Sequence, residues 1–189
     1  MSTSNTMQNI KFLVQALSES INTRATKGVL FLVLDDENVQ GLYTYGKLKK
    51  VTEEYESANK AIISTAFSDY GVKKVVVAAK HSEESGITGC LDDALKLLNK
   101  VNLNGWLSVP QVTSDTDKKK VADFIKSQRN DEDYPLKGVL ANYKADHEAI
   151  VNFTGTDLGV GITSDQYTAE VAMLLCTLGA VSYTHLRAH

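Results

Sequence analysis

The sequence contains few of the residues that carry metal, redox and nucleophilic chemistry. Of its 189 residues, two are cysteines and four are histidines. Cys90 and Cys176 are far apart and lie in helix-like stretches, without the short Cys-x-x-Cys spacing of zinc and redox sites. We therefore expect two buried thiols in a reducing compartment, with neither a disulfide nor a metal site.

The sequence also lacks an excess of either charge. It has 20 Lys and Arg residues against 23 Asp and Glu residues, for a formal net charge of -3. Domains that bind nucleic acid usually concentrate positive charge on one face. The longest run of one sign, the three lysines at 118–120, has acidic neighbours and is typical of a solvated helix face. The charge pattern gives no reason to expect a nucleic-acid partner.

No apolar run in the sequence approaches the roughly 20 residues of a membrane-spanning helix. Residues 1–8 are polar, without the basic segment and apolar block of a secretory signal. We therefore expect no membrane insertion. The protein is expected to stay in the cytoplasm where it is made, unless a larger assembly carries it out.

What the sequence does contain is an alternation of apolar strands with amphipathic helices. The six apolar residues at 29–34, ended by Asp35 and Asp36, are typical of a strand buried on both faces, as are residues 75–77. Shorter strands are predicted at residues 10–14, 41–45, 105–109, 136–142 and 149–153. This alternation predicts an α/β fold in which helices flank a largely parallel sheet.

Four helices are predicted from capping residues and from apolar residues at helical spacing. Ser57 is expected to cap the first helix, which Gly71 ends, and Ser114 is expected to cap the third. The last helix is expected to begin at Thr163, where Gln166 completes a capping box. The predicted inward faces are Ile62, Ile63, Ala66, Phe67 and Tyr70; Leu91, Ala94, Leu95, Leu98 and Val101; Val121, Phe124 and Ile125; and Tyr167, Val171, Leu174, Leu175 and Leu178.

The strongest candidate for chemistry is the acidic cluster of Asp35, Asp36 and Glu37 at the end of the first buried strand. Ligands of open α/β sheets bind at the carboxyl ends of strands, and carboxylates there can hold Mg²⁺. Receiver domains of response regulators begin similarly, so a cytoplasmic regulatory domain that binds magnesium at Asp35 and Asp36 is an alternative interpretation. It lacks a carboxylate after residues 75–77, and Lys144 is followed by Ala145 instead of proline. The cluster is better explained as a polar strand end.

The other motifs are incomplete. Gly159 and Gly161 precede a helix, but Ser164 replaces the third glycine of a dinucleotide-binding loop. His81 and His147 have no second histidine or cysteine at ligand spacing, and the chain has no Gly-x-Ser-x-Gly elbow. We therefore predict no catalytic, cofactor-binding or metal-binding residue, which favours a structural or binding role over an enzyme.

The stretch at residues 162–172 reads Ile-Thr-Ser-Asp-Gln-Tyr-Thr-Ala-Glu-Val-Ala. It resembles a segment of contractile phage tail sheath proteins that reads roughly Y-T-A-x-[IV]-A-G-x-x-A-G. Residues 23–35 resemble the early R-x-x-R-G and apolar strand of that family, and the order of strands and helices is similar over residues 9–178. Beyond position 172, larger residues replace the small residues of the family. The positions that carry the helix motif are Tyr167, Thr168, Ala169, Val171 and Ala172.

The resemblance implies a structural subunit of a contractile tail sheath, which polymerises around a tail tube and contracts to drive the tube through a cell envelope. It implies neighbouring sheath subunits, a tube protein and a baseplate as partners, with no cofactor and no enzymatic activity. Phages, prophages and other contractile injection systems use such sheaths. The subunit is expected in the virion tail, after assembly in the host bacterial cytoplasm. The central domain of the family is sometimes called subtilisin-like, but a fold name does not bring protease activity with it.

The resemblance also implies a division of the chain. Residues 1–27 are expected to form an extended arm and linker, and residues 28–180 a sheath core truncated at its C-terminus. Residues 181–189 look like an adaptor-derived tail foreign to the protein. In the arm, Ile10, Phe12 and Val14 are expected to add as a strand to the sheet of a neighbouring subunit. The alternative is that this strand pairs within its own sheet.

Overall fold

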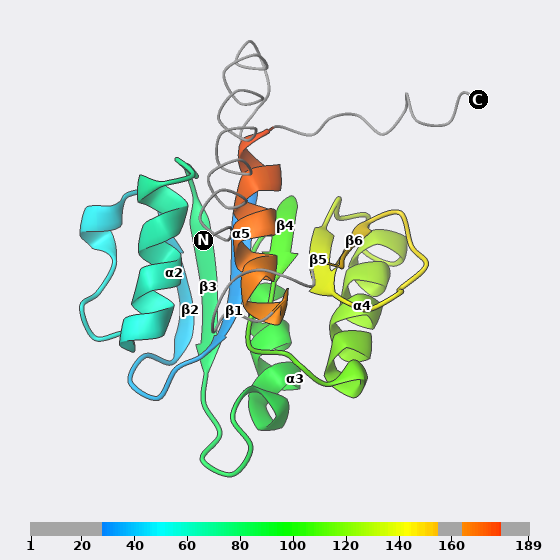
Figure 1. Cartoon of the computed structure of the whole chain (residues 1–189), viewed down its shortest axis with the longest axis horizontal. Coiled ribbons are helices and arrows are strands. Elements are labelled where there is room, and N and C mark those ends of the chain that lie inside the picture. The colour runs from blue at the N-terminus through cyan, green and yellow to red at the C-terminus, as the bar shows by residue number, and fades with distance from the viewer. Residues whose placement is uncertain (1–27, 155–163, 179–189) are drawn as a thin grey trace, which may run out of the picture.

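The computed structural model describes residues 28–154 and 164–178, which form a six-stranded sheet and its helices (Figure 1). The strands lie in the order β2-β3-β1-β4-β5-β6, with β2 antiparallel to β3 and every other pairing parallel. The largely parallel α/β sheet predicted from the sequence is thus confirmed. The strands are β1 Val29–Asp35, β2 Gly41–Tyr45, β3 Val75–Lys80, β4 Gly105–Ser108, β5 Lys137–Ala141 and β6 Ile150–Phe153.

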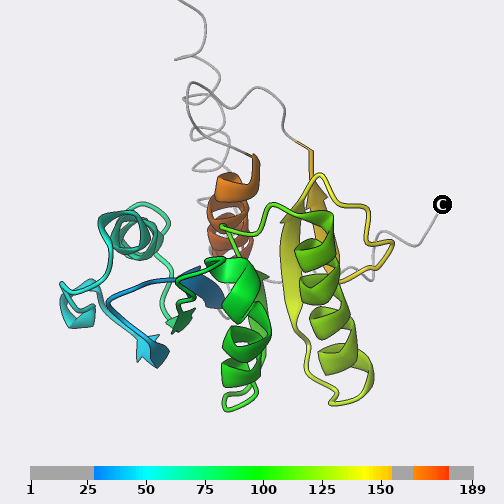
Figure 2. The same ribbon diagram turned by 90° about the horizontal axis from the view of Figure 1, so that it is seen from below.

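Helices cover both faces of the sheet. They are α2 Ser57–Ser68, α3 Ile87–Leu98, α4 Asp115–Asn130 and α5 Ser164–Thr177, with a short 3-10 helix η1 at Leu48–Lys50. α3 and α4 lie on one face, and α2 and α5 lie on the other (Figure 2). Within the described residues, none of the helices combines the length and the hydrophobicity that a membrane crossing requires.

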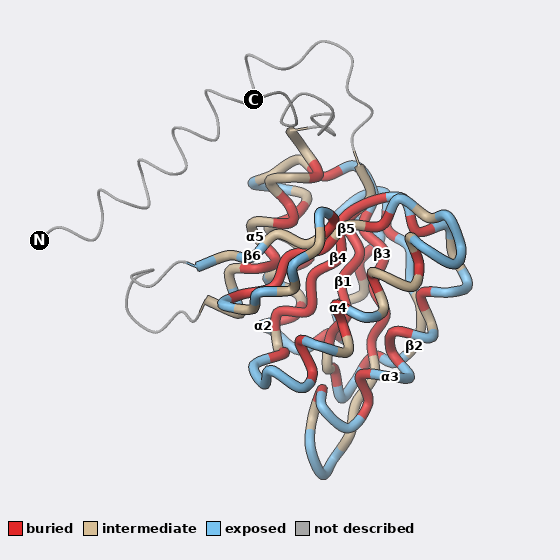
Figure 3. Tube along the Cα trace, turned by 90° about the vertical axis from the view of Figure 1, so that its right-hand side faces the viewer, coloured by how far each residue is buried: buried red, intermediate tan, exposed pale blue. Residues whose placement is uncertain are grey.

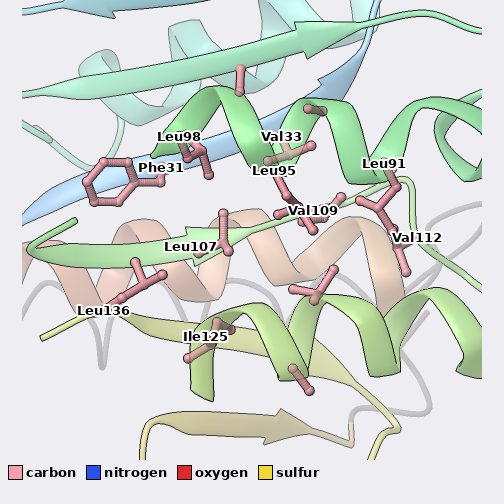
Figure 4. Packing of buried hydrophobic residues seen from close by; sticks show 14 of the residues in the cluster. Phe31, Val33, Leu91, Leu95, Leu98, Leu107, Val109, Val112, Ile125 and Leu136 are labelled. Carbon is pink, nitrogen blue, oxygen red and sulfur yellow. The ribbon is translucent and has the colours of Figure 1, made fainter. Parts of the chain in front are cut away.

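Side-chain alternation in β1 explains the two layers of the core. Phe31 and Val33 point toward α3 and α4, while Leu30, Leu32 and Leu34 point toward α2 and α5. All five side chains are fully buried, because helices cover both faces of this central strand. Figure 4 shows Phe31 and Val33 against the apolar side of α3. In Figure 3 the buried residues follow the central strands, and β2 at the sheet edge is more exposed.

The predicted helix caps are confirmed in two places and wrong in one. Ser114 is the N-cap of α4, and its hydroxyl accepts a hydrogen bond from the backbone N–H of Asp117 at 3.1 Å. Gly71 follows α2 with a φ of 63°, a conformation that favours glycine. Ser57, however, is the first residue of α2 and not its cap. Glu56 occupies the cap position because its backbone N–H and its carboxylate are both engaged with the loop after β1.

The inward faces predicted for the first three helices largely agree with the structure. Phe124 and Val101 are only partly buried, and Val101 lies beyond the end of α3. Ile62, Phe67 and Tyr70 are also partly buried, and they pack against the core. The predicted residues that are buried are Ile63, Ala66, Leu91, Ala94, Leu95, Leu98, Val121 and Ile125.

The inward face predicted for the last helix is right only in part, because Val171 and Leu175 pack against the core but the fully buried residues are others. The large residues at 167, 171, 174, 175 and 178 are only partly buried. Trp106 and Val139 of the sheet already fill the layer beneath α5, so the helix contributes mostly small side chains and lies close to the strands. The backbone N–H of Gly28 even donates to the carbonyl of Cys176 at 3.0 Å. Thr163, the expected cap, lies outside the described residues. The buried residues of α5 are Thr168, Ala169, Ala172, Met173 and Cys176.

Candidate functional site

The acidic cluster after β1 lies at the topological switch point of the sheet. Strand β1 has β3 on one side and β4 on the other, and the helices that follow β1 and β4 lie on opposite faces. Ligands of open α/β sheets bind outside the carboxyl ends of strands at such a point. Asp35 is the last residue of β1, and Asp36 follows it. The carboxyl end of β1 is therefore the first place to look for a functional site.

The carboxylate of Asp36 is fully buried and engaged on both oxygens. Oδ1 accepts hydrogen bonds from the backbone N–H groups of Asn38 at 3.1 Å and Val39 at 2.8 Å. Oδ2 accepts from the backbone N–H of Glu56 at 3.0 Å and the side-chain amide of Asn59 at 2.8 Å. These four bonds use the roughly four acceptor positions of a carboxylate. Asp36 thus ties the β1–β2 loop to α2, and no oxygen of it remains for a metal ion.

Two amide side chains extend this network toward β4. Asn59 is 1% exposed, and its amide donates to the backbone carbonyl of Asp35 at 2.6 Å. Gln111 accepts from the backbone N–H of Asp35 at 2.9 Å and donates to the carbonyl of the same residue at 3.0 Å. Its amide also donates to Asn59 Oδ1 at 3.1 Å. The network therefore closes the gap between β1 and the β4–α4 connection, where a ligand would enter.

The side chain of Asp35 has a different partner. His81 Nδ1 lies 2.9 Å from Asp35 Oδ1, and the two side chains are 24% and 21% exposed. This hydrogen bond to a carboxylate raises the pKa of His81 against the smaller opposing effect of burial. Within the described residues, His81 makes no hydrogen bond to a hydroxyl or thiol that it could activate as a nucleophile. The pair therefore anchors the β3–α3 loop to the end of β1.

The magnesium-binding alternative has little support at the carboxyl ends of these strands. The described residues contain no group of three or more side chains that could hold a metal ion. Strand β3 ends at Lys80 without a carboxylate, and Lys144 is an exposed residue in the loop after β5. His147 accepts a hydrogen bond from a backbone N–H two residues on, which is a local structural contact. Gly159 and Gly161 lie outside the described residues.

A second polar cluster connects the two helix layers at the same end of the strands. Asp117 is 2% exposed and accepts hydrogen bonds from the hydroxyls of Thr88 and Ser114, each at 2.8 Å. Burial by itself would raise the pKa of Asp117, but these hydrogen bonds outweigh it, and the pKa is lowered. Lys118 is 5% exposed and forms an ion pair with Asp165 of α5 at 2.8 Å.

The sequence-based prediction that residues 118–120 form a solvated run is therefore wrong for Lys118. Its partner lies 47 positions further along the chain, so no local pattern could have predicted the pairing. Lys119 is exposed, as predicted.

The motif residues of α5 attach the helix to the sheet and do not form a reactive centre. The hydroxyl of Thr168 lies 2.9 Å from that of Ser108 at the end of β4, and both residues are buried. Ala169 and Ala172 are buried in the same layer, and the Tyr167 ring stacks on Phe153 of β6 with centroids 6.4 Å apart. Val171 is partly buried. Ile10, Phe12 and Val14 lie outside the described residues.

The chain is similar in sequence to a phage tail sheath protein and to an uncharacterized bacterial protein. It is 31% identical over 179 residues to the tail sheath protein of Clostridium phage phiCD119, a match that covers 89% of this chain and 48% of that protein. It is 48% identical over 52 residues to the uncharacterized protein YqbK of Bacillus subtilis, which covers 26% of this chain and 11% of that protein. The chain thus spans about half the length of the phage protein, and its match to YqbK spans a smaller share of that protein. No protein-family model matches it.

Two solved structures share its fold. The sheath tail protein Lin1278 of Listeria innocua has a TM-score of 0.59 at 14% identity, covering 87% of this chain and 59% of that chain. The sheath tail protein DSY3957 of Desulfitobacterium hafniense has a TM-score of 0.60 at 14% identity, covering 81% and 60%. The resemblance predicted from residues 162–172 and from the order of elements is confirmed by these matches.

Proposed function

Because this chain belongs to the tail sheath protein family, we propose that it is a structural subunit of a contractile tail sheath, which polymerises around a tail tube and contracts to drive the tube through a cell envelope. The observation that carries the proposal is the sequence match to a phage tail sheath protein along 89% of the chain. The proposed partners are neighbouring copies, the tube protein and the baseplate. The proposed location is the virion tail, after assembly in the host bacterial cytoplasm.

A role without catalysis is supported by the way the switch-point edge is engaged. The groups that would take part in chemistry there are used to hold the fold: Asp36 by its four donors, and Asp35 by His81. Rigid-body movement of subunits is one of the known modes of large conformational change. The ion pair of Lys118 with Asp165 joins α4 to α5 across the sheet and supports such rigidity.

For the ends of the chain, we keep the division inferred from the resemblance. Residues 1–27 act as an arm, residues 28–180 form the incomplete core, and residues 181–189 are foreign to the protein. Ile10, Phe12 and Val14 add to the sheet of a neighbouring subunit through main-chain hydrogen bonds, which survive large rigid-body shifts because they need little side-chain specificity.

The arm is tested by deleting residues 1–20. The deleted protein is expected to keep the circular dichroism spectrum and the unfolding transition of the intact chain, and to lose assembly. A matched control replaces the polar residues Lys11 and Gln15 by alanine, which leaves the strand's apolar side intact. Loss of folding on deletion would instead assign the strand to the chain's own sheet.

The function is tested on the complete open reading frame that contains this chain, as far as that frame extends. The purified protein is examined by negative-stain electron microscopy. Hollow striated tubes or stacked rings are the expected result. A soluble monomer under all assembly conditions would contradict the proposal and return attention to the regulatory-domain alternative, which is then tested by magnesium titration of Asp35 and Asp36.

A further inference from the structure

Strand β2 forms one side edge of the sheet, and its outer side has no partner strand among the described residues. It pairs with β3 alone, in a register that runs without a bulge from Gly41 opposite Ala79 to Tyr45 opposite Val75. Within the described part of the chain, no backbone hydrogen bond joins residues 41–45 to a segment other than β3. An edge of this kind presents unpaired N–H and C=O groups to a further strand.

The β2 edge also lacks the features that usually protect an exposed edge strand, which are charged side chains, prolines and bulges. The strand reads Gly-Leu-Tyr-Thr-Tyr, with no charged residue and no proline. The large hydrophobic side chains that are exposed in the described residues lie here: Tyr43, 36% exposed, within β2, and Leu48, 42% exposed, just after it. The described residues of β6, at the other side edge, expose none. The β2 edge is therefore the surface best suited to a partner strand.

Tyr43 is exposed but held in place before any partner binds. Its ring stacks on that of Tyr45 with centroids 6.3 Å apart, and it lies edge-on to the ring of Tyr55 at 6.5 Å. Its hydroxyl donates a hydrogen bond to the backbone carbonyl of Gln40 at 3.0 Å. Tyr45 and Tyr55 are themselves buried. A fixed aromatic side chain loses little conformational entropy on binding, and such residues are typical anchors of protein interfaces.

The charges beside β2 favour a second copy of the same strand in the antiparallel direction. Tyr43 is the middle residue, so all five residues of the two strands pair only when Tyr43 lies opposite its counterpart. No like charges meet within this pairing, which would be destabilising. Glu37 lies six positions before Tyr43 and Lys49 six positions after it, and both are exposed. An antiparallel pair brings Glu37 of each copy to the same end as Lys49 of the other, where the two charges attract.

We propose that β2 pairs antiparallel with β2 of a second copy, about a twofold axis at Tyr43, and so joins two sheets into one. Both copies use the same surface, so the contact is isologous and is complete with two copies. The inference goes beyond the proposed function and does not rest on it, because a twofold pair does not extend into a row of subunits. The pairing closes an edge that would otherwise be a template for aggregation.

Disulfide cross-linking of a single variant tests the register. Tyr43→Cys in the 189-residue chain is expected to form a covalent dimer under mild oxidation. Directly opposite residues of antiparallel strands have Cβ atoms about 5 Å apart, which is close to the separation in a disulfide. The native thiols of Cys90 and Cys176 are buried and are not expected to react.

The matched control is Leu48→Cys, because Leu48 is similarly exposed but lies five positions from the proposed axis. The two copies of residue 48 then lie at opposite ends of the paired strands, too far apart for a disulfide. Equal cross-linking of the control, or no cross-linking of Tyr43→Cys at high protein concentration, overturns the proposal.

Charge exchange tests the antiparallel direction. Glu37→Lys or Lys49→Glu alone is expected to weaken dimerisation about tenfold in sedimentation velocity, because the twofold axis repeats each repulsive pair. The combined variant is expected to recover most of this loss, since the pairs re-form with their signs exchanged. Tyr43→Lys is expected to abolish the dimer and to keep the circular dichroism spectrum, because it places like charges opposite each other at an exposed position. An unaltered chain that stays monomeric, or a combined variant as weak as the single variants, contradicts the pairing.

The other candidate for this edge is the N-terminal segment that contains Ile10, Phe12 and Val14. Deletion of residues 1–27 distinguishes the two occupants. If β2 pairs with its own copy, the Tyr43→Cys cross-link and the dimerisation constant are expected to be unchanged by the deletion. A cross-link that forms only after the deletion would show that the N-terminal segment covers the edge, and it would overturn the proposal.

Discussion

The buried carboxylate of Asp36 allows the sharpest prediction about stability. Truncation by Asp36→Ala removes the acceptor of four hydrogen bonds at once. The backbone N–H of Val39 and the amide of Asn59 are buried, and each costs about 2 kcal/mol when left unpaired. The N–H groups of Asn38 and Glu56 are partly buried and reach water, so each costs about 0.5 kcal/mol. The expected loss in the free energy of unfolding is therefore about 5 kcal/mol.

Urea denaturation followed by circular dichroism measures this loss. The matched control is Glu37→Ala, because Glu37 is exposed and its hydrogen bond to Glu56 uses its backbone N–H. The control is expected to change the free energy of unfolding by less than about 0.5 kcal/mol. A loss below about 2 kcal/mol in Asp36→Ala would refute the argument that this carboxylate holds the edge. Stabilisation of the unaltered chain by Mg²⁺ that is absent in Asp36→Ala and kept in Glu37→Ala would likewise show that Asp36 is free to bind a metal ion.

Three further predictions concern α5 and the titratable side chains. Ala172→Leu is expected to cost about 1–3 kcal/mol because it overpacks the layer beneath α5, whereas Leu174→Ala costs less; equal losses in urea denaturation would contradict the observed helix face. The pairing of His81 with Asp35 is expected to stabilise the fold fully below about pH 6.5 and to lose that effect as pH rises through the raised pKa of His81; a histidine NMR titration in Asp35→Asn that leaves the pKa unchanged would refute it. Burial raises the pKa of Cys176 to about 12, so a thiol reagent at mildly alkaline pH is expected to label it only after unfolding; rapid labelling of the folded chain would contradict its burial.

The two ends of the strands differ: a polar network fills the carboxyl ends, called here the closed end, and a pocket lies at the amino ends. At the closed end, buried polar groups satisfy one another, as Asp117 does with Ser114 and Thr88. At the opposite end of the strands, a pocket of about 550 Å³ is lined by Trp106, Lys74 and Lys137 among others. Since buried polar groups without partners are costly, the mutual hydrogen bonds at the closed end favour a structural role for these side chains.

Much of the fold followed from local patterns. The apolar run at residues 29–34 predicts a strand buried on both faces, and β1 is the fully covered centre of the sheet. Ser114 predicts the start of α4 because its hydroxyl satisfies an N–H that every helix leaves unpaired at this end. Such features are readable from sequence because the groups that decide them are only a few residues apart.

The features that the sequence did not reveal depend on residues far apart in the chain. The large residues of α5 form the more hydrophobic side, so periodicity favoured Tyr167 and Leu174 as inward residues. Which side faces inward depends on how much space the sheet leaves, and Trp106 takes much of it. Lys118 similarly reads as a solvated lysine until the fold brings Asp165 next to it.

By itself the sequence determined the class of fold, the positions of its strands and the family to which the chain belongs. It did so because strand burial, helix caps and the motif at residues 162–172 are written in neighbouring residues. Only the tertiary structure decided that Asp36 holds a loop and cannot serve a metal ion, since two of its four donors, Glu56 and Asn59, lie 20 and 23 positions further along the chain. It also brought Lys118 next to Asp165, a residue 47 positions further along the chain.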